Sequence, residues 1–424
     1  MTVPVPSILR LLADGRADDY LVAHDGHRPL LWKEFRRMIE ERRSGLATER
    51  RRILLTDPSP IDFLAGLLAA LADGHVPVIP PNFQPETLAA FAAMPEPTEL
   101  PANTLELYTS GSTGEPKCIR KTLRQLEAEC GVLESCWGEA AGGATVAATT
   151  PHHHIYGLLF RLLWPLTAGR PIDNATIAEP SSLTERLSSL NDVVLVSSPA
   201  QLSRLPQLAD LAAMTRRPRL VFSSGGPLPP ELARHYADTW GDAPVEVFGS
   251  TETGGIAWRR QSEDSPAWTP LPQVQLAADA DGALLVRSPF LPDNSPLRME
   301  DAVEFDPDGC FVLRGRLDRI VKIEEKRLSL PEMENWLDRH PAVAAAAVVP
   351  VPMGRRTVVG AVVVPQSGLP EDRKGLAATL KDHLKQRYDA VLLPRRWRFV
   401  ERLPYSERGK LAVDDLVNLL STPL

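Results

Sequence analysis

The sequence predicts an α/β body followed by a smaller α+β unit, and two observations support this fold class. Upstream of Gly315, short apolar or β-branched runs alternate with helix-like segments, which is typical of α/β proteins. After Gly315 the pattern changes to valine-rich runs and two helix-like segments within about 110 residues, a normal size for a small domain. We therefore expect one domain over residues 1–314 and another over residues 315–424.

In the body, each predicted strand is a short apolar run, and most of these runs lead into a helix or a polar loop. Two of them end in loops rich in Gly, Ser and Thr. The predicted strands are His75–Ile79, Leu105–Tyr108, Val193–Ser197, Leu220–Phe222 and Val245–Phe248, and the predicted helices are Leu64–Leu71, Gln201–Ala213 and Pro230–Trp240.

The smaller unit has its own alternation of strands and helices. One helix is expected at Pro331–Arg339, where proline occupies the first position, and a second at Leu376–Arg387. The predicted strands are Ile320–Ile323, Val343–Val351 and Val358–Val364.

Composition excludes several classes of protein. The chain has 424 residues, of which 43% are hydrophobic and 24% charged, as in globular proteins. The longest uncharged apolar stretch, Pro341–Gly354, is shorter than the ~20 residues that span a bilayer, and charges in the first twenty residues argue against a signal peptide. Four cysteines without metal-ligand spacing indicate a reduced, cytoplasmic protein. A membrane protein, a disulfide scaffold and a zinc ribbon are therefore disfavoured.

The net charge of −7 is unevenly distributed along the chain. From Gly315 onward, 19 Lys and Arg residues outnumber 14 Asp and Glu residues, whereas the preceding part has a balance of −12. A basic unit attached to an acidic body is one interpretation, and two ordinary solvated surfaces are the other. No basic run interleaved with aromatic residues dominates the chain, so nucleic-acid binding is not favoured.

The first motif is the segment Tyr108-Thr-Ser-Gly-Ser-Thr-Gly-Glu-Pro-Lys117, which directly follows a predicted strand. Its small side chains and exposed N–H groups suit a loop that wraps phosphate oxygens, and Lys117 adds a positive charge. It is not a Walker A loop, because Cys118 follows the lysine and the glycine spacing differs. An ordinary surface turn remains the alternative.

A second loop, Phe248-Gly-Ser-Thr-Glu-Thr-Gly-Gly255, also follows a predicted strand. Glu252 is a carboxylate among hydroxyls and glycines, which suits Mg²⁺ held against phosphates. Upstream, Ser223-Ser-Gly-Gly-Pro-Leu228 allows backbone to approach a flat ligand closely, although a glycine pair is also typical of a tight turn.

Taken in order, these segments resemble the adenylate-forming (ANL) superfamily of acyl-CoA synthetases, aryl-acid ligases, adenylation domains and luciferases. Gly315–Ile323, with Glu332 and Glu334, is similar to the family's hinge, and Leu403–Lys410 to its C-terminal lysine motif. The resemblance implies a body that binds ATP and an acid, and a C-terminal lid that rotates about the hinge. It also implies two half-reactions, in which a carboxylate attacks the ATP α-phosphorus and a thiol then displaces AMP.

The resemblance also implies roles for individual residues. Lys410 is expected to bridge the carboxylate and the α-phosphate, Thr251 to contact the α-phosphate, and Glu252 to hold Mg²⁺. Phe248 is expected to stack on adenine, Asp301 to bind the ribose hydroxyls with help from Arg316, and Asp318 to act as the hinge. The remaining expected nucleotide-binding positions are Thr109, Ser110, Gly111, Ser112, Thr113, Gly114, Lys117, Gly225, Gly226, Pro227, Gly249 and Ser250.

Three consecutive histidines in Pro151-His-His-His-Ile-Tyr-Gly157 suggest a metal site, but neighbouring residues on a strand or loop point in different directions. The segment resembles the family's Pro-x-x-His-x-x-Gly motif, which maps onto His154 and Gly157. There the imidazole is expected to lie over the acyl pocket. Amino-acid-activating relatives have an aspartate near this point, so an amino-acid substrate is disfavoured.

Two departures from the family pattern are visible. Only about 27 residues separate the strand ending near Pro80 from Tyr108, which suggests a compact, N-terminally shortened member. Glu325 stands where the hinge motif normally has glycine, and in the family this loop approaches the thiol tunnel. The second departure brings ordinary use of CoA into question without affecting adenylation.

The sequence therefore predicts an ATP- and Mg²⁺-dependent ligase that forms an acyl-adenylate and transfers the acyl group to a phosphopantetheine thiol. Because the C-terminal unit is basic, an acyl carrier protein is preferred as acceptor over free CoA. The compact body leaves little material for a long-chain tunnel, which favours an aromatic or short acyl carboxylate. The resemblance to compact members of the family implies an aromatic acid such as a hydroxybenzoate. The alternatives are an acyl-CoA synthetase and a non-catalytic homologue that binds nucleotide or acyl-adenylate.

Overall fold

The computed structural model divides the chain into two compact units. It describes residues 6–46, 51–96, 103–110, 116–177, 180–212, 214, 216–261, 266–293, 295–323, 326–353, 356–366, 368–369, 371–404, 411 and 413–421. The large unit comprises Met1–Leu276 and Val286–Leu297, and the small unit comprises Ala277–Leu285 and Arg298–Leu424. The predicted boundary between residues 314 and 315 marks the start of a lid that rotates. A division into compact units does not test such a motion, so this boundary stays a prediction.

The main sheet of the large unit confirms the predicted α/β class. Among the described residues its strand order is β13-β12-β11-β10-β9-β7-β8-β1-β2. Neighbouring strands from β11 through β1 pair in parallel, and the pairs at both edges are antiparallel. The strands are β1 Leu21–Asp25, β2 Arg28–Leu31, β7 Thr145–Ala148, β8 Ile172–Thr176, β9 Val193–Ser197, β10 Leu220–Ser223, β11 Val245–Ser250, β12 Gly254–Arg260 and β13 Thr269–Pro270.

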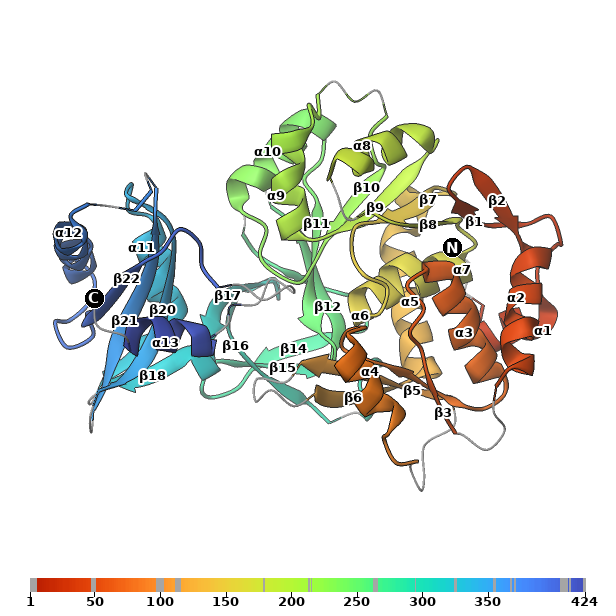
Figure 1. The fold of residues 1–424 in the computed structure, drawn as a ribbon, viewed down its shortest axis with the longest axis horizontal. Helices are drawn as coiled ribbons and strands as arrows, with labels where there is room; N and C mark the ends of the chain where they lie inside the picture. Colours follow the sequence, from red (N-terminus) through yellow and green to blue (C-terminus); the bar gives the residue numbers. More distant parts are fainter. Residues whose placement is uncertain are drawn as a thin grey trace. The chain divides into compact units, whose positions relative to one another are not determined.

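Helices α8 (Pro180–Ser189), α9 (Pro199–Leu208) and α10 (Pro230–Trp240) cover part of this sheet (Figure 1). Their apolar faces share one hydrophobic cluster with residues of β9 and β10. The predicted helix Gln201–Ala213 ends earlier, at Leu208, because Ala209 is extended and the Asp210 carboxylate accepts a hydrogen bond from the Ala212 N–H. That local turn competes with continuation of the helix.

A second sheet in the large unit has the order β3-β4-β5-β6. Its strands are β3 Arg52–Leu54, β4 Val76–Ile79, β5 Thr104–Ser110 and β6 Pro116–Thr122, of which the first three are parallel. The predicted buried helix is α3 (Pro60–Ala72), which begins at proline after the capping side chain of Ser59. The other elements are α1 Ile8–Asp14, α2 Trp32–Ser44, α4 Pro85–Ala92, α6 Ile155–Gly157, a π-helical segment Leu158–Leu163 and α7 Trp164–Ala168.

Helix α5 (Leu123–Ala141) connects the second sheet to the main sheet. It starts directly after β6, where Thr122 and Gln125 cap each other's backbone N–H groups. It also reaches the main sheet, because the Gly255 N–H in β12 donates to the Glu129 carboxylate at 2.7 Å. The helix thereby fixes β6 and β12 relative to each other.

The small unit is built from small sheets and helices. β14 (Gln275–Ala278), β15 (Ala283–Arg287), β16 (Leu297–Phe305) and β17 (Phe311–Arg316) form one sheet. β20 (Val343–Met353) and β21 (Arg356–Pro365) form a long hairpin that β22 (Arg396–Phe399) joins in parallel. The remaining elements are the hairpin β18 (Ile320–Ile323) and β19 (Lys326–Ser329), and helices α11 Leu330–Asp338, α12 Arg373–Lys385 and α13 Val413–Ser421.

Candidate active site

The first Gly/Ser/Thr motif connects the two strands of a hairpin. Thr109 in β5 is paired with Lys117 in β6, and Ser110 with Pro116, so the loop begins and ends at adjacent backbone positions. The Lys117 side chain is 61% exposed. Gly111, Ser112, Thr113 and Gly114 lie outside the described residues.

The second motif is a tight hairpin turn between β11 and β12, and the strand extends two residues beyond the predicted end at Phe248. Ser250 is paired with Gly254, and the Thr253 hydroxyl accepts from the Ser250 N–H at 2.9 Å and donates to the Gly254 carbonyl at 2.7 Å. A side chain at Gly249 would place its Cβ 2.0 Å from the Gly254 carbonyl oxygen. Glycine is therefore required for the two strands to approach this closely.

The two motifs meet in space although 135 residues separate them. Lys117 Nζ lies 2.7 Å from Glu252 Oε1. Burial is the largest single influence on Glu252 and opposes its ionisation, but the hydrogen bonds to the carboxylate and the positive charge of Lys117 together lower the pKa of the carboxyl group below its usual value. The sequence predicted a phosphate-side role for both residues, and the structure places them in contact.

The predicted adenine-binding positions follow two neighbouring parallel strands. Gly225, Gly226 and Pro227 come directly after β10 and are exposed, while Phe248 lies near the end of β11. The Ser224 hydroxyl ties the two segments together by donating to the Val247 carbonyl at 2.8 Å. The Phe248 ring contacts the Trp268 ring, with centroids 5.4 Å apart. The carboxyl ends of adjacent parallel strands are a usual place for a nucleotide to bind in an open α/β sheet.

Two buried charged residues behind the Glu252 turn were missed by sequence reasoning. Lys121 is 2% exposed and donates to the Glu252 carbonyl at 2.7 Å, and Glu129 is 1% exposed. Burial lowers the pKa of Lys121 and raises the pKa of Glu129 to about 7. One signal was available: Lys121 lies four residues after Lys117 on one strand, so their side chains share a face.

The histidine segment forms a compact group of rings. His152 is 3% exposed, its Nε2 lies 3.0 Å from the Asp57 carbonyl oxygen, and its ring packs on Phe63. Burial lowers the pKa of His152 to about 4, which keeps the ring neutral. The His153 and His154 rings are 4.3 Å apart, and His154 directly precedes α6. Within the described ranges no group of three His, Cys, Asp or Glu side chains is arranged to hold a metal ion.

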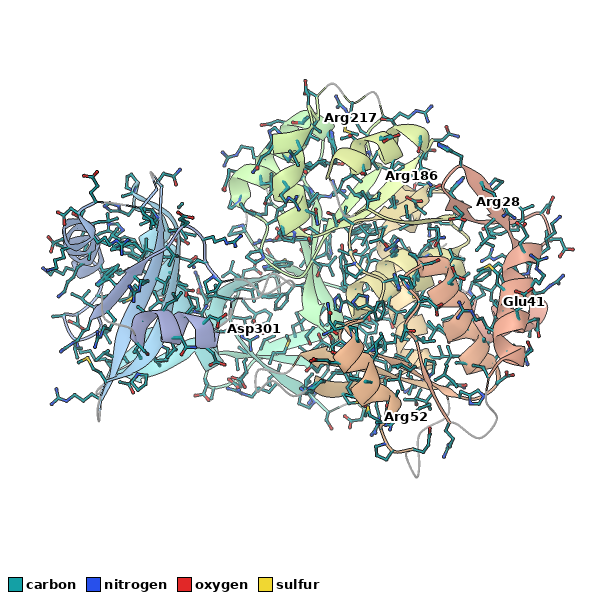
Figure 2. The ribbon with its side chains drawn as sticks, in the orientation of Figure 1. Arg28, Glu41, Arg52, Arg186, Arg217 and Asp301 are labelled. Atoms are coloured by element: carbon teal, nitrogen blue, oxygen red, sulfur yellow. The ribbon has the colours of Figure 1, made fainter. Side chains whose placement is uncertain are left out.

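In the small unit, the expected ribose residue and its helper are cross-strand partners. Asp301 in β16, labelled in Figure 2, pairs with Arg316 in β17. An Arg316 guanidinium nitrogen lies 3.6 Å from an Asp301 carboxylate oxygen. The Asp301 side chain is 12% exposed. Asp318 falls in a short 3₁₀ turn, Leu317–Arg319, and both Glu325 and Lys410 lie outside the described residues.

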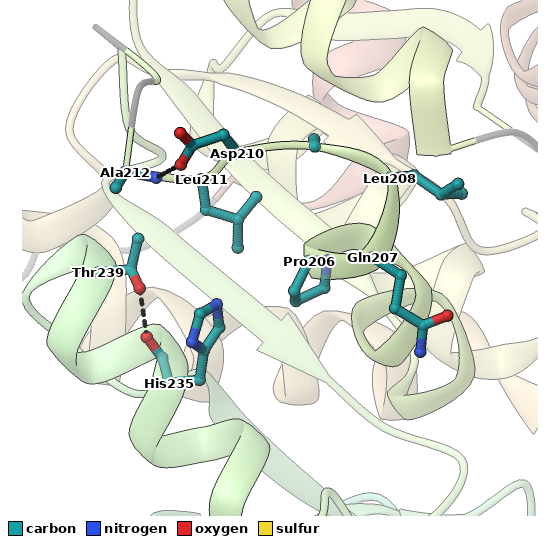
Figure 3. A pocket seen from close by; sticks show the side chains of 9 residues that line it. Pro206, Gln207, Leu208, Asp210, Leu211, Ala212, His235 and Thr239 are labelled. Carbon is teal, nitrogen blue, oxygen red and sulfur yellow. Dashed lines mark hydrogen bonds between the residues drawn. The ribbon is translucent and has the colours of Figure 1, made fainter.

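An open hollow of about 480 Å³ lies at the C-terminal end of α9 beside α10 (Figure 3). Residues 206–212 line one side, and His235 and Thr239 of α10 line the other. The Thr239 hydroxyl donates to the His235 carbonyl within the helix. None of the predicted site residues lines this hollow, so it is separate from the candidate nucleotide site.

Comparison with known proteins identifies the family. Residues 93–282 match the AMP-binding enzyme family, and residues 332–410 match the AMP-binding enzyme C-terminal domain. A 4-coumarate–CoA ligase from Rhodobacter capsulatus is 31% identical over 310 residues, which cover 71% of this chain and 73% of the relative. A sulfoacetate–CoA ligase from Cupriavidus necator is 28% identical over 94% of this chain and 79% of the relative. The crystal structure of ATP-bound MatB from Rhodopseudomonas palustris superposes with a TM-score of 0.80, at 20% identity, over 97% of this chain and 98% of that one.

The fold and the matched sequence together define an ATP-using, adenylate-forming enzyme. The chain belongs to the AMP-binding enzyme family of the adenylate-forming superfamily and is an AMP-forming acid–thiol ligase. None of the described helices has both the length and the apolar character needed to cross a bilayer.

Proposed function

We propose that this ligase activates an aromatic carboxylic acid as its adenylate and transfers the acyl group to the phosphopantetheine thiol of an acyl carrier protein. The observation that best supports a nucleotide site is the contact between Lys117 and Glu252. It joins the two Gly/Ser/Thr motifs at one point, where an ammonium group and a carboxylate are both partly exposed to a ligand. Positioned charges and N–H groups are the main requirements of phosphoryl and nucleotidyl transfer.

In this proposal the phosphates lie between the two motifs. Thr109, the loop that follows it and Lys117 hold the β- and γ-phosphates, and Thr251 contacts the α-phosphate. Phe248 stacks on adenine beside residues 225–227, while Asp301 binds the ribose hydroxyls and Arg316 orients Asp301. The Arg316–Asp301 contact supports the last pairing, because it holds the carboxylate in one direction.

Glu252 is the residue that fits Mg²⁺. Its carboxylate is one-third exposed and ionised, and oxygen ligands are those that Mg²⁺ prefers. A single protein carboxylate suffices, because Mg²⁺ commonly binds through one or two carboxylates together with substrate phosphates and waters. When bound, the ion would neutralise phosphate charge beside Glu252, and Lys117 would contact the phosphates.

The remaining residues act on the acid. A carboxylate oxygen attacks the α-phosphorus, the bond to the bridging oxygen breaks, and pyrophosphate leaves with that electron pair. Lys410 stabilises the negative charge shared by the carboxylate and the α-phosphate. In the second step the thiol, having lost its proton, attacks the acyl carbonyl and AMP leaves, after the lid (residues 315–424) has turned about Asp318.

An aromatic acid is supported by the neutral, ring-rich character of the Pro151–Gly157 segment. Here His154 would lie against the acid, and the described residues of the segment carry no acidic group that would pair with an amino-acid ammonium. The name of the Rhodobacter relative also refers to an aromatic acid. A small aliphatic acid is the second candidate, since the Cupriavidus relative is named for sulfoacetate.

A carrier protein as acceptor is supported by the excess of basic residues after Gly315. Arg356 and Arg395 are both exposed, and the Arg395 N–H bonds the Val359 carbonyl, three residues along β21 from Arg356. This arrangement gives the sheet one basic end that suits an acidic partner. Free CoA is the second candidate, because both reported relatives are named as CoA ligases.

The four cysteines bear on the compartment in which this chemistry takes place. All of them are among the described residues and all are free thiols. This supports the predicted cytoplasmic location, where thiols stay reduced.

The proposal is tested with a pyrophosphate-release screen of aromatic and short aliphatic acids, followed by thiol loading. Lys410→Ala is expected to reduce adenylation by at least about a thousandfold, because electrostatic stabilisation of the transition state is lost. Unchanged pyrophosphate exchange in this variant would refute the role of Lys410. Fast turnover with CoA and no loading of holo-carrier protein would refute the preferred acceptor.

A further inference from the structure

We infer that Lys121 and Glu129 are positioning residues that hold the Glu252 turn, Thr251–Thr253, from behind and so set the direction of its carboxylate. This inference rests on the proposed function, in which Glu252 binds Mg²⁺. Neither residue touches the nucleotide in that proposal. They act through the Glu252 carbonyl and through the backbone that follows it.

Lys121 holds the backbone of Glu252 itself, at the centre of the turn. Its ammonium donates to the Glu252 carbonyl at 2.7 Å and to the Phe290 carbonyl at 2.9 Å. Both acceptors belong to the large unit, so one side chain ties the turn to a distant segment of the same unit. A buried ammonium is stable only when such partners are present, because it has lost its water. The cost of burying Lys121 therefore makes its contact with Glu252 difficult to break.

Glu129 holds the C-terminal side of the turn. It accepts from the Gly255 N–H at 2.7 Å, and a side chain on Gly254 would place its Cβ 2.2 Å from the Glu129 carboxylate. Gly254 also has φ of +70°, a conformation that other residues seldom adopt. The absence of a side chain at Gly254 therefore allows the Glu129 carboxylate of α5 to approach this closely. Glu129 in turn holds the backbone of residues 254–255 in position.

The two residues and Lys117 hold the turn at three points. Lys117 contacts the Glu252 carboxylate, Lys121 contacts its carbonyl, and Glu129 fixes the strand that follows. Lys117 and Lys121 share one face of β6, so a single strand controls both the backbone and the side chain of Glu252. A displacement of roughly 1 Å at a catalytic group can cost about a hundredfold in rate, which is why such support matters.

The test measures ATP binding by calorimetry, with and without Mg²⁺, in the full-length chain. Lys121→Met keeps the length of the side chain and removes its donors, and Glu129→Leu keeps roughly the volume of the side chain and removes the acceptor of the Gly255 N–H. Each is expected to weaken ATP binding in the presence of Mg²⁺ by roughly tenfold to a hundredfold, as is usual for residues that orient a metal ligand. Binding without Mg²⁺ should change less than threefold, an estimate that follows from the absence of direct contact with the nucleotide.

A matched control is the buried pair Arg186–Asp173 in the same unit, of which Arg186 is labelled in Figure 2. Asp173 lies on β8, which β7, β9 and β10 separate from β11 in the main sheet. Its atoms are 2.7 Å apart, and the two side chains are 12% and 0% exposed. Asp173→Asn is expected to lower the melting temperature while leaving the Mg²⁺ effect on ATP binding as in the wild type. This separates a positioning role from a general loss of stability.

Glu252→Gln distinguishes failure of the inference from failure of the proposed function. If Glu252→Gln loses the Mg²⁺ effect and both Lys121→Met and Glu129→Leu retain it, the inference is overturned and the proposed function stands. If Glu252→Gln retains the Mg²⁺ effect, the proposed role of Glu252 is overturned, and the inference with it. Should Lys121→Met not fold, Glu129→Leu decides the question alone, since it roughly preserves volume and lacks only the acceptor for the Gly255 N–H.

Discussion

The Glu252 turn and the histidine segment Pro151–Gly157 are both fixed in place, but by opposite means. Charged groups hold the turn: Lys117, Lys121 and Glu129 contact either Glu252 or the strand that follows it. Neutral rings and backbone hold the histidine segment, in which His152 packs between Phe63 and its neighbours. The difference matches the ligand proposed for each region: a polyphosphate at the Glu252 turn and an aromatic acid at the histidine segment.

The pKa values of the buried groups follow the same division. At the turn, burial raises the pKa of Glu129 to about 7, and at the histidine segment burial lowers the pKa of His152 to about 4. In both cases the charged form is disfavoured. Near neutral pH, however, Glu129 is close to its titration and has Lys121 nearby, whereas His152 is fully neutral. A change of pH near neutrality therefore changes the charge of Glu129 behind the turn, but it does not change the charge of His152 in the histidine segment.

The largest effects are expected from adding one methyl group at a glycine in each region. Gly249→Ala places Cβ 2.0 Å from the Gly254 carbonyl oxygen, and Gly157→Ala places it 2.0 Å from the Pro151 carbonyl oxygen. Backbone must move in both, so each variant should lose about 3 kcal/mol of stability. Gly249→Ala should raise the KM for ATP, and Gly157→Ala the KM for the acid, each by roughly tenfold or more.

The control for these variants is Gly131→Ala in helix α5, where the added Cβ meets no atom within 4 Å. It should stabilise the protein by about 0.5–1 kcal/mol through helix propensity and leave both KM values unchanged. Denaturant unfolding and steady-state kinetics on the three variants check the prediction. If Gly249→Ala and Gly157→Ala both changed the KM for ATP and the KM for the acid to the same extent, the assignment of ATP to one region and the acid to the other would be contradicted.

A smaller effect is expected at His154. The ring is half-buried and packs against His153, with the ring centroids 4.3 Å apart. His154→Ala should raise the KM for an aromatic acid by up to about tenfold, the value of one aromatic contact, and leave the Kd for ATP unchanged. Kinetics with the acid varied at saturating ATP give the measurement, and His27→Ala at an exposed position serves as control. A changed Kd for ATP with normal acid kinetics would reverse the assignment.

The sequence predicted the scaffold of the site well, because strand and helix signals are local. Strand Val193–Ser197 and helix Pro230–Trp240 are confirmed with their predicted bounds, and the predicted buried helix is confirmed within Pro60–Ala72. The helix predicted over Gln201–Ala213 extends beyond the observed end of α9 at Leu208. The turn at Asp210 that follows α9 depends on a side-chain hydrogen bond, which apolar periodicity does not reveal.

The support behind the motifs was not predicted, and the reason is physical. Lys121 and Glu129 are charged residues on core-facing positions, and nothing in their local sequence shows that carbonyl and N–H partners will come from residues more than a hundred positions away. Sequence patterns likewise did not show that Lys117 and Glu252 are in contact, since a long-range pair depends on how the two sheets are joined. Conformational requirements at Gly249 and Gly254 become clear only when the opposite strand is seen.

Burial of His152 and Glu129 also makes stability depend on pH. The native pKa of His152 is about 4, below the ordinary value of 6.5, so its contribution to stability is present above about pH 6.5 and is lost as pH falls towards 4. The native pKa of Glu129 is about 7, above the ordinary value of 4.5, so its contribution is present below about pH 4.5 and is lost as pH rises towards 7.

The two slopes oppose each other between about pH 4.5 and 6.5, and each is at most about 1.4 kcal/mol per pH unit. In the wild type they largely cancel over this range. In His152→Phe only the Glu129 contribution remains, so the stability of this variant relative to the wild type should fall as pH rises. In Glu129→Gln only the His152 contribution remains, so the stability of that variant relative to the wild type should rise with pH. Urea unfolding at half-unit pH steps measures both differences. If both variants run parallel to the wild type, neither buried group titrates differently in the folded and unfolded chain, and the contrast between the two regions is then one of packing alone.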